Sequence, residues 1–290
     1  MKKTICLITA LVMLAACIVC FTACGDNGDE FVAEDAIDLL QEDFGIAVTK
    51  GNDKLLAAVN KVIDEWNENG KMQQYKDYYQ ALAAEESEGQ KAVAPEGLQV
   101  EWDFGNATET ITVYTEAGFE PYEFMYNGEV VGLDIAIMAQ VAVNEGKKID
   151  VKNILFDTIP VSVATATGDA VGAAAITIND ERKEQVDFSN VYESSTLVVV
   201  SKNGQCKSVK DLAGKRVGVQ EGTSGDLIIS AAIKGGYVYK KEDGGSVTVK
   251  AEGAEVKQYK QYALAFADLK NGRIDAILMD KIPAQLMLSK

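Results

Sequence analysis

The amino-acid sequence predicts an α/β protein in which short strands alternate with helices. Runs such as "ITVYT" (111–115) and "STLVVVSK" (195–202) are rich in β-branched residues and typical of buried strands. Segments with apolar residues at helical spacing lie between such runs, and this alternation favours largely parallel sheets. The chain has 290 residues, 47% of them hydrophobic, which is enough for two lobes of ordinary size.

The first expected elements are a strand and two helices. "DFGIAVTKGN" (43–52) is read as a strand with a turn after it. Asn52 is placed to cap the next helix and Gly70 to end it. The apolar positions at helical spacing are Leu55, Leu56, Val59, Val62, Ile63 and Trp66 in this helix, then Met72, Tyr75, Tyr79 and Leu82 in the second.

The periodicity is lost over residues 84–109, which collect Glu, Gly and Pro, so we expect a linker there. Beyond it, Asn127-Gly128 between apolar flanks indicates a hairpin turn. Further strands are expected at 111–115, 150–156, 169–176, 195–202, 215–220 and 274–280. Further helices are expected at 133–146, 208–214, 221–233, 262–272 and 282–290.

The N-terminus reads as an export signal, because a basic start precedes an apolar run that ends in "FTAC". This ending resembles the lipobox of bacterial lipoproteins, which implies a signal peptide at 1–23, lipidation of Cys24 and a tether at 24–35. Cleavage at Cys17 is the competing site, but it would leave an apolar segment on the mature chain. An uncleaved membrane anchor is a second alternative. Each reading places the bulk of the chain outside the cytoplasm.

The charge balance and the absence of histidine exclude several classes of function. Lys and Arg number 28 against 44 Asp and Glu, which gives a net charge of −16, so a nucleic acid partner is not expected. The missing histidine removes the commonest general base and the commonest metal ligand. Four of the five cysteines lie in the N-terminal apolar run, which leaves Cys206 without a partner. We expect neither a metal site nor a cofactor.

Several motifs, in order and spacing, resemble the extracellular solute-binding proteins of family 3, the amino-acid receptors of ABC importers. They cover roughly residues 110–290 and are "TEAGFEPYEF", "GEVVGLDIAIM", "AITINDERKEQVDFSNVY", "SVKDLAGKRVGVQEGTSGD" and "LKNGRIDAILMD". The resemblance implies a two-lobed, periplasmic-binding-protein-like (type II) fold. It also implies two crossing hinge strands, here "TLVVVSK" and "FGIAVTK".

The resemblance implies that the chain is circularly permuted. In the family, a segment like 36–83 comes last, as a hinge strand and two helices of lobe 1. Lobe 1 would then continue at 110–194, lobe 2 would be 195–290, and the linker 84–109 would join the old ends. Termini are often close together, and about 26 flexible residues span about 25 to 30 Å. The alternative is a stray tail from a fused neighbour, with the receptor truncated at Lys290.

Arg182 is the candidate for gripping the carboxylate of an amino acid, since a guanidinium donates two parallel hydrogen bonds to it. Taken alone, Arg182 belongs to a charged run that would form a solvated face. The resemblance assigns it the α-carboxylate, with hydroxyl and amide contacts from Thr177. Ala175 matches a position that is usually glycine or small and polar, and its carbonyl would accept from the ammonium.

Lobe 2 offers two further candidate sites. Thr223 and Ser224 begin a helix, where amides can hold an anion. A phosphate-binding loop is disfavoured because no Lys-Ser/Thr pair follows. Asp280 ends a strand at the edge where ligands of α/β sheets bind, and the resemblance makes it the counter-ion of the ammonium. An N-cap role for Asp280 fits the local sequence equally well.

Three residues after the first strand of lobe 1 complete the candidate site. The resemblance implies that Phe119 stacks on the ligand side chain, and Tyr122 lies just beyond Pro121. Core packing is the alternative for these aromatic residues. Glu116 would favour a polar or cationic side chain, unless it is an exposed residue at a strand end.

We therefore expect a lipid-anchored, monomeric receptor that closes on a free, polar amino acid and delivers it to an ABC permease. The alternative is an enzyme on the same fold that resembles prephenate or arogenate dehydratases, with Glu116 or Asp280 as the acid. A ligand-sensing module is a third alternative.

Overall fold

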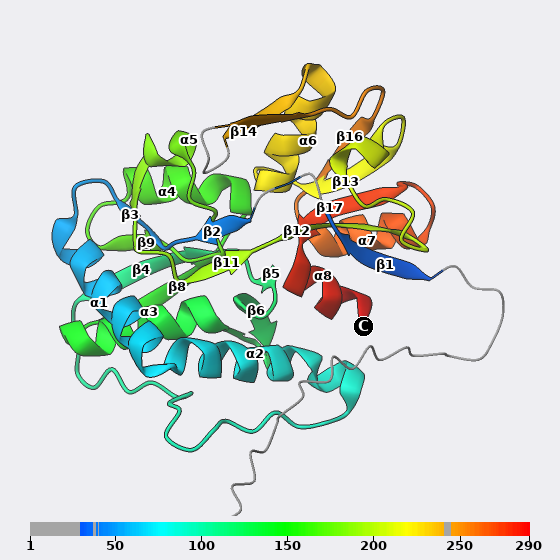
Figure 1. Cartoon of the computed structure of the whole chain (residues 1–290). Coiled ribbons are helices and arrows are strands. Elements are labelled where there is room, and N and C mark those ends of the chain that lie inside the picture. The colour runs from blue at the N-terminus through cyan, green and yellow to red at the C-terminus, as the bar shows by residue number, and fades with distance from the viewer. Residues whose placement is uncertain (1–29, 37–38, 40, 241–244) are drawn as a thin grey trace, which may run out of the picture.

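The computed structural model describes residues 30–36, 39, 41–240 and 245–290, and it forms two α/β lobes (Figure 1). The prediction of a two-lobed α/β fold is confirmed. The first lobe contains the sheet β10-β3-β9-β4-β8, in which β4 is parallel to β8 and β9. The second contains the sheet β1-β12-β17-β13-β16, in which β13 is parallel to β16 and β17.

The strands of the first lobe and its small sheet are β3 (Ala47–Thr49), β4 (Thr110–Thr115), β5 (Gly118–Phe119), β6 (Glu123–Tyr126), β7 (Glu129–Val131), β8 (Lys148–Asn153), β9 (Ala170–Gly172) and β10 (Val186–Phe188). Its helices are α1 (Asp53–Asn69), α2 (Lys71–Glu88), α3 (Leu133–Glu145), α4 (Ile159–Thr165), α5 (Asp180–Lys183) and the 3₁₀ turn η1 (Phe156–Thr158).

The strands of the second lobe are β1 (Phe31–Asp35), β12 (Leu197–Lys202), β13 (Arg216–Gln220), β14 (Tyr237–Lys240), β15 (Ser246–Val249), β16 (Glu255–Tyr259) and β17 (Ala276–Asp280). Its helices are α6 (Ser224–Lys234), α7 (Tyr262–Lys270), α8 (Lys281–Leu288) and the 3₁₀ turn η2 (Val209–Leu212). Strands β2 (Glu42–Phe44) and β11 (Glu193–Ser195) pair between the lobes.

The two early helices form as the sequence predicts. The Asn52 side chain accepts a hydrogen bond from the Leu55 amide, and Gly70, at φ 78°, ends α1 in a left-handed conformation that favours glycine. The apolar face of α1 is buried, and Trp66 stacks on Tyr75 of α2 with ring centroids 4.4 Å apart. These contacts place α1 and α2 in the core of the first lobe.

The N-terminal segment belongs to both lobes, as the blue strands of Figure 1 show. β1 pairs with β12 at the edge of the second sheet, whereas β3 lies between β10 and β9 in the first. Residues 31–35, which we expected in a tether, therefore form a strand instead. The sequence missed it because "FVAED" is short and ends in acids, yet an edge strand needs a partner on one side only.

The crossing between the lobes is made by the antiparallel pair β2 and β11, with Phe44 opposite Glu193. The expected crossing strand "TLVVVSK" lies instead in the second sheet as β12, one residue beyond β11. "FGIAVTK" similarly begins at the end of β2 and continues into β3 of the first sheet. The two connections therefore run side by side.

The segment expected as a linker begins later than predicted, because α2 continues to Glu88. Beyond α2, residues 89–109 contain neither helix nor strand. They are held against the first lobe, since the Tyr75 hydroxyl donates to the Gln99 carbonyl at 2.7 Å and Trp102 packs on the core.

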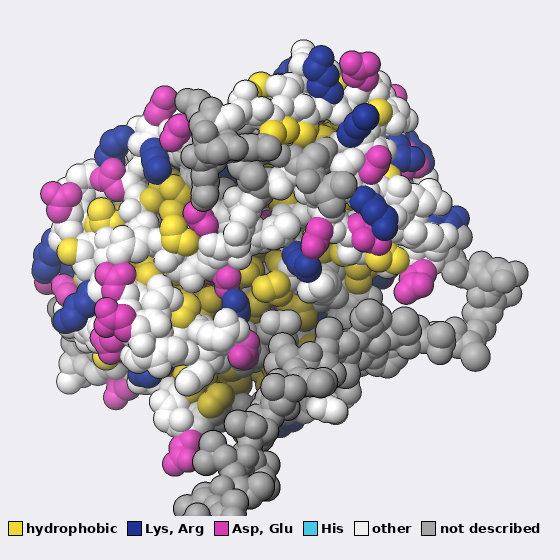
Figure 2. All heavy atoms as spheres, viewed as in Figure 1, with side chains coloured by type: hydrophobic (Ala, Val, Ile, Leu, Met, Phe, Trp, Pro, Cys, Tyr) yellow, Lys and Arg dark blue, Asp and Glu magenta, His cyan; other side chains and the backbone are white. Residues whose placement is uncertain are grey.

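None of the described helices is long and apolar enough to cross a bilayer. The candidate lipidation residues Cys24 and Cys17 lie outside the described residues. On the face drawn in Figure 2, acidic and basic side chains are interspersed over both lobes.

Candidate ligand-binding cleft

A small cavity lies where the lobes meet, at the carboxyl ends of strands from both sheets. Glu116 follows β4, Gln220 ends β13 and Asp280 ends β17. Ligands of α/β sheets bind at this edge. The side chains leave ≈ 10 Å³ for the centre of a water-sized molecule, room for roughly one water. The wall consists of Glu116, Phe119, Glu123, Phe156, Ala174, Ala175, Thr177, Gln220, Thr223, Ser224 and Asp280.

Asp280 is part of the cavity wall and is buried. Asp280 occupies the N-cap position of α8, as the alternative reading expected, but its side chain makes no capping hydrogen bond. Among the described residues, no donor reaches Oδ1. Burial raises the pKa of Asp280, and the nearby charge of Glu42 raises it further, while a hydrogen bond from Ser195 opposes this. Within the part of the chain that the structure describes, Oδ1 of Asp280 is therefore a buried oxygen without a hydrogen-bond partner, and a cation beside it would favour the ionised carboxylate.

Glu116 and Glu123 add two more carboxyl groups to this end of the cavity. Glu116 accepts hydrogen bonds from Gln220 (3.0 Å) and Gln261 (2.8 Å), both in the second lobe. Oε2 of the buried Glu123 has no partner among the described residues. Burial raises the pKa of both groups, and nearby carboxylates, above all Asp134, raise that of Glu123 further. The three carboxyl groups together define the acid end of the cleft.

The aromatic residues divide between cavity and core. Phe119 lines the cavity and stacks between Tyr122 (centroids 6.0 Å apart) and Tyr262 (6.1 Å). Tyr122 is 1% exposed and does not line the cavity, because it packs edge-on against Phe44 at 5.4 Å. Of these two ligand candidates, the structure places only Phe119 at the cavity.

Arg182 is buried at the junction of the lobes, so it does not lie on a solvated face. The Asn179 side chain accepts from its amide at 2.8 Å and starts the short helix α5. Its guanidinium donates to the carbonyls of Thr177 (2.7 Å) and Gly222 (2.9 Å), one in each lobe. It lies over the Phe156 ring, 5.5 Å from the centroid, at the rim of the cavity rather than in its wall.

Thr177 and Ser224 face each other across the cleft, with their hydroxyl oxygens 3.5 Å apart. Both hydroxyls donate to Glu42 Oε2, at 3.1 Å and 2.5 Å. Within the described part of the chain, neither residue's amide donates a hydrogen bond. Arg182 and these two residues form the donor end of the cleft.

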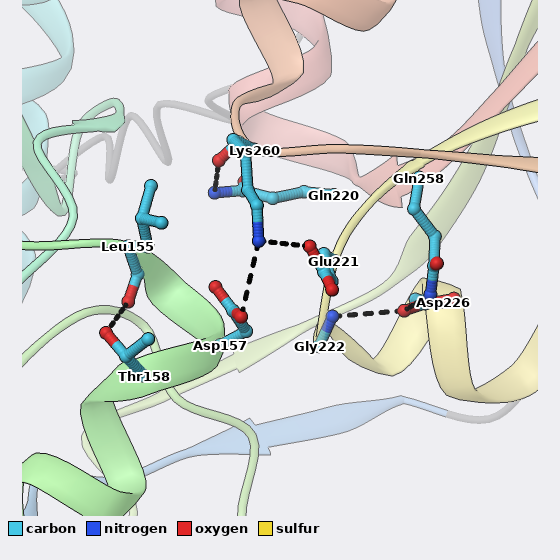
Figure 3. Close-up of polar contacts among 9 residues, drawn as sticks. All are labelled: Leu155, Asp157, Thr158, Gln220, Glu221, Gly222, Asp226, Gln258 and Lys260. Carbon is cyan, nitrogen blue, oxygen red and sulfur yellow. Dashed lines mark hydrogen bonds and ion pairs between the residues drawn. The ribbon is translucent and has the colours of Figure 1, made fainter.

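At the start of α6, two main-chain amides already donate hydrogen bonds to nearby side chains. The Thr223 hydroxyl caps the helix by accepting from the Asp226 amide (3.4 Å), while Asp226 accepts from the Gly222 amide (3.0 Å, Figure 3). A carboxylate thus already occupies an amide that a phosphate would need, which argues against a phosphate-binding loop.

Ala175 joins the cavity wall in a conformation that is rare for alanine. Its φ of 45° lies in the left-handed region, which costs a residue with a Cβ about 1 kcal/mol. The Ala175 amide donates to the buried Asp134 carboxylate at 3.0 Å, and the Tyr192 hydroxyl donates to the same oxygen at 2.9 Å. These contacts hold the strained turn in place.

A second set of contacts joins the lobes beside the cavity (Figure 3). Lys260 of the second lobe points toward Asp157 of the first, with Nζ 3.5 Å from Oδ2, and also pairs with Glu221. A Cβ on Gly222 would lie 3.0 Å from the Cβ of Asp157, so glycine allows this close approach. The lobes are therefore also in direct contact through Lys260, Gly222 and Asp157.

Sequence reasoning missed Glu42, Glu123, Phe156 and Gln220. Gln220 was detectable, since it ends a parallel strand next to the one that ends in Asp280. Phe156 had a similar signal, since it ends the strand expected at 150–156, whereas Glu123 had none. Glu42 reaches the cleft only through the pairing of β2 with β11.

Comparisons with known proteins agree with this geometry. A family model described as bacterial extracellular solute-binding proteins, family 3, matches residues 111–277. ABC transporter arginine-binding protein 1 of Escherichia coli K12 is 31% identical over 187 residues, covering 63% of this chain and 68% of that protein. The L-cystine-binding protein TcyJ of the same organism is 29% identical over 185 residues, or 62% of each chain.

A solved structure is also similar: an ancestral arginine-binding protein bound to arginine, at 34% identity and a TM-score of 0.54, covering 63% of this chain and 75% of that one. The match thus spans three fifths to three quarters of these proteins. Because the family model matches more than half of the chain, the chain belongs to the bacterial extracellular solute-binding proteins, family 3.

Proposed function

We propose that this protein binds a free amino acid with a cationic side chain between its lobes and delivers it to an ABC permease. The observation that carries the proposal is the polarity of the cleft. Arg182 and the amides of Thr177 and Ser224 suit a carboxylate, and Asp280 suits an ammonium. Glu116 and Glu123 add two carboxyl groups whose raised pKa a neighbouring cation would lower, so a second positive group on the ligand would be favourable.

Binding requires the lobes to separate and close again, because the cavity holds roughly one water. Closure would be favoured by ligand contacts to both lobes that an open state cannot make. The aromatic wall at Phe119 would pack against the aliphatic part of the ligand. The arginine-binding relatives support a cationic ligand, whereas the cystine-binding relative shows that related chains differ in specificity.

Calorimetric titration of the protein with each of the twenty amino acids tests this function. We expect saturable binding of arginine or lysine, with neutral amino acids at least tenfold weaker. Saturable binding of no amino acid would contradict the proposal. Turnover of prephenate or arogenate would instead support an enzyme on this fold. Among the described residues, no group of three or more His, Cys, Asp or Glu side chains is arranged to hold a metal ion.

We also propose that the chain is circularly permuted. This is supported by the family match, which begins at residue 111, although the earlier segment supplies β3 to the middle of the first sheet and β1 to the edge of the second. A variant with residues 30–83 moved behind Lys290 should fold and bind like the parent. If the segment were a stray tail, its deletion would leave the melting temperature unchanged.

For its location, we propose a position outside the cytoplasm with a lipid anchor at Cys24. The family is extracellular, and the apolar N-terminal run supports export. Cys24→Ser should move the protein from the membrane fraction to the soluble extracytoplasmic fraction, whereas Cys17→Ser should not. The reverse result would assign the anchor to Cys17. Size-exclusion chromatography with light scattering tests the monomeric state.

A further inference from the structure

Glu42 is a charged residue at the cleft that the proposed function does not use. It is the first residue of β2 and reaches the cleft from the connection between the lobes. Its Oε2 accepts from the Ser224 hydroxyl of the second lobe at 2.5 Å and from the Thr177 hydroxyl of the first at 3.1 Å. One carboxylate oxygen thus links both lobes.

These two hydroxyls belong to the residues whose amides are available for an incoming carboxylate. Among the described residues, no ion pair to Glu42 occurs, and the hydrogen bonds to its carboxylate come from these two hydroxyl groups. Burial raises its pKa, and the hydroxyls and the more distant Arg182 lower it. A charge held in this way is only partly compensated.

A second carboxylate placed on Arg182, Thr177 and Ser224 would lie close to that of Glu42. Two like charges at such a distance repel each other, so both cannot keep their hydrogen bonds without cost. Glu42 would have to withdraw from the hydroxyls as the ligand carboxylate arrives.

We propose that Glu42 is an internal competitor, whose carboxylate joins the lobes through Thr177 and Ser224 until the carboxylate of the ligand displaces it. The inference rests on the proposed amino-acid binding. Its consequence is that the protein binds its ligand more weakly than its contacts allow, because only the fraction with Glu42 displaced is competent.

The test compares Glu42→Gln and Glu42→Ala with Asp43→Asn and Asp43→Ala. Asp43 is the matched control, since it is the next acid in β2 but is exposed and accepts from Ser194 at 2.6 Å. Titration with arginine should show at least about tenfold tighter binding for both Glu42 variants and no change for the Asp43 variants. Equal or weaker binding by folded Glu42 variants would overturn the proposal.

Ser224→Ala provides a second variant should the Glu42 variants fail to fold. It removes the shorter of the two hydrogen bonds of Glu42 and keeps the Ser224 amide. Tighter arginine binding by Ser224→Ala supports competition, whereas weaker binding means that the hydroxyl serves the ligand, which contradicts it.

X-ray scattering without added amino acid separates this inference from the proposed function. Glu42→Ala should have a larger radius of gyration than the parent, because one of the contacts that join the lobes is lost, and Asp43→Ala should not. If no variant binds any amino acid, the proposed function fails, and an unchanged radius for Glu42→Ala then overturns the inference as well.

Discussion

The two ends of the cleft differ in how their polar groups are satisfied. At the acid end, Asp280 Oδ1 and Glu123 Oε2 are buried, and no donor reaches them within the described part of the chain. At the donor end, Arg182 donates to main-chain carbonyls of both lobes, and the hydroxyls of Thr177 and Ser224 donate to Glu42.

Among the described residues, the acid end therefore has unused hydrogen-bond acceptors, whereas the polar side chains of the donor end are already hydrogen-bonded within the protein. A cation at the acid end would supply hydrogen bonds that the protein does not make, and leaving buried acceptors unpaired is costly. A carboxylate at the donor end would have to replace existing bonds. We therefore expect the acid end to attract the ligand and the donor end to set how firmly the lobes close on it.

The largest expected effect comes from Arg182. Arg182→Ala should weaken arginine binding more than a hundredfold, about 3 kcal/mol, because the ligand carboxylate would be buried without its cation. Titration calorimetry measures the change. Arg216→Ala is the control, since Arg216 is exposed and pairs with Asp275. Equal binding by Arg182→Ala and the parent would show that Arg182 does not bind the ligand carboxylate.

The next effect concerns the acid end itself. Asp280→Asn should weaken binding by roughly thirtyfold to a hundredfold, through loss of the ion pair to the ammonium. The same variant should melt at a higher temperature, since it neutralises a carboxylate whose pKa is raised by burial. The exposed Asp150→Asn should change neither quantity. Unchanged binding would show that Asp280 does not face the ammonium.

A smaller change is expected at Glu116. Glu116→Gln keeps the shape of the side chain and removes its charge, so arginine binding should weaken about tenfold while glutamine binding stays constant. The ratio of the two dissociation constants gives the result directly. A parallel loss for both amino acids would mean that Glu116 acts only through its bonds to Gln220 and Gln261.

The smallest effect on binding, but a measurable one on stability, is expected at Asp134 behind the acid end. Burial raises its pKa to about 7, from an ordinary value of 3.8. Between pH 4 and 7 the folded state therefore holds a proton that the unfolded state has released, so the free energy of unfolding should fall as pH rises through this range. Denaturant unfolding at several pH values should show this slope.

Between pH 4 and 7, Asp134→Asn should reduce the total change in the free energy of unfolding by on the order of 1 to 3 kcal/mol, which makes the slope smaller. The slope should not vanish, because burial also raises the pKa of Glu123 and Asp280. An unchanged slope would assign the pH dependence to those residues alone.

Local signals predicted the helices better than the strand pairing. The helix α1 follows from its apolar spacing, the Asn52 cap and Gly70, all of which act within a few residues. Strand β1 was missed because its stability depends on β12, more than 160 residues away. Tyr122 and Phe119 carry similar local signals. They differ only in the folded protein, where Tyr122 packs against Phe44 and Phe119 lines the cavity.

The fold class, the family and most of the cavity wall could be predicted from the amino-acid sequence, because they depend on periodicity and on motifs contiguous in the chain. The three-dimensional arrangement was needed to show that Arg182 lies at the rim, that the Asp280 side chain does not cap α8 and that Glu42 accepts hydrogen bonds from both lobes. These facts depend on the register of β2 with β11 and on the approach of two lobes, so no local segment of the chain encodes them.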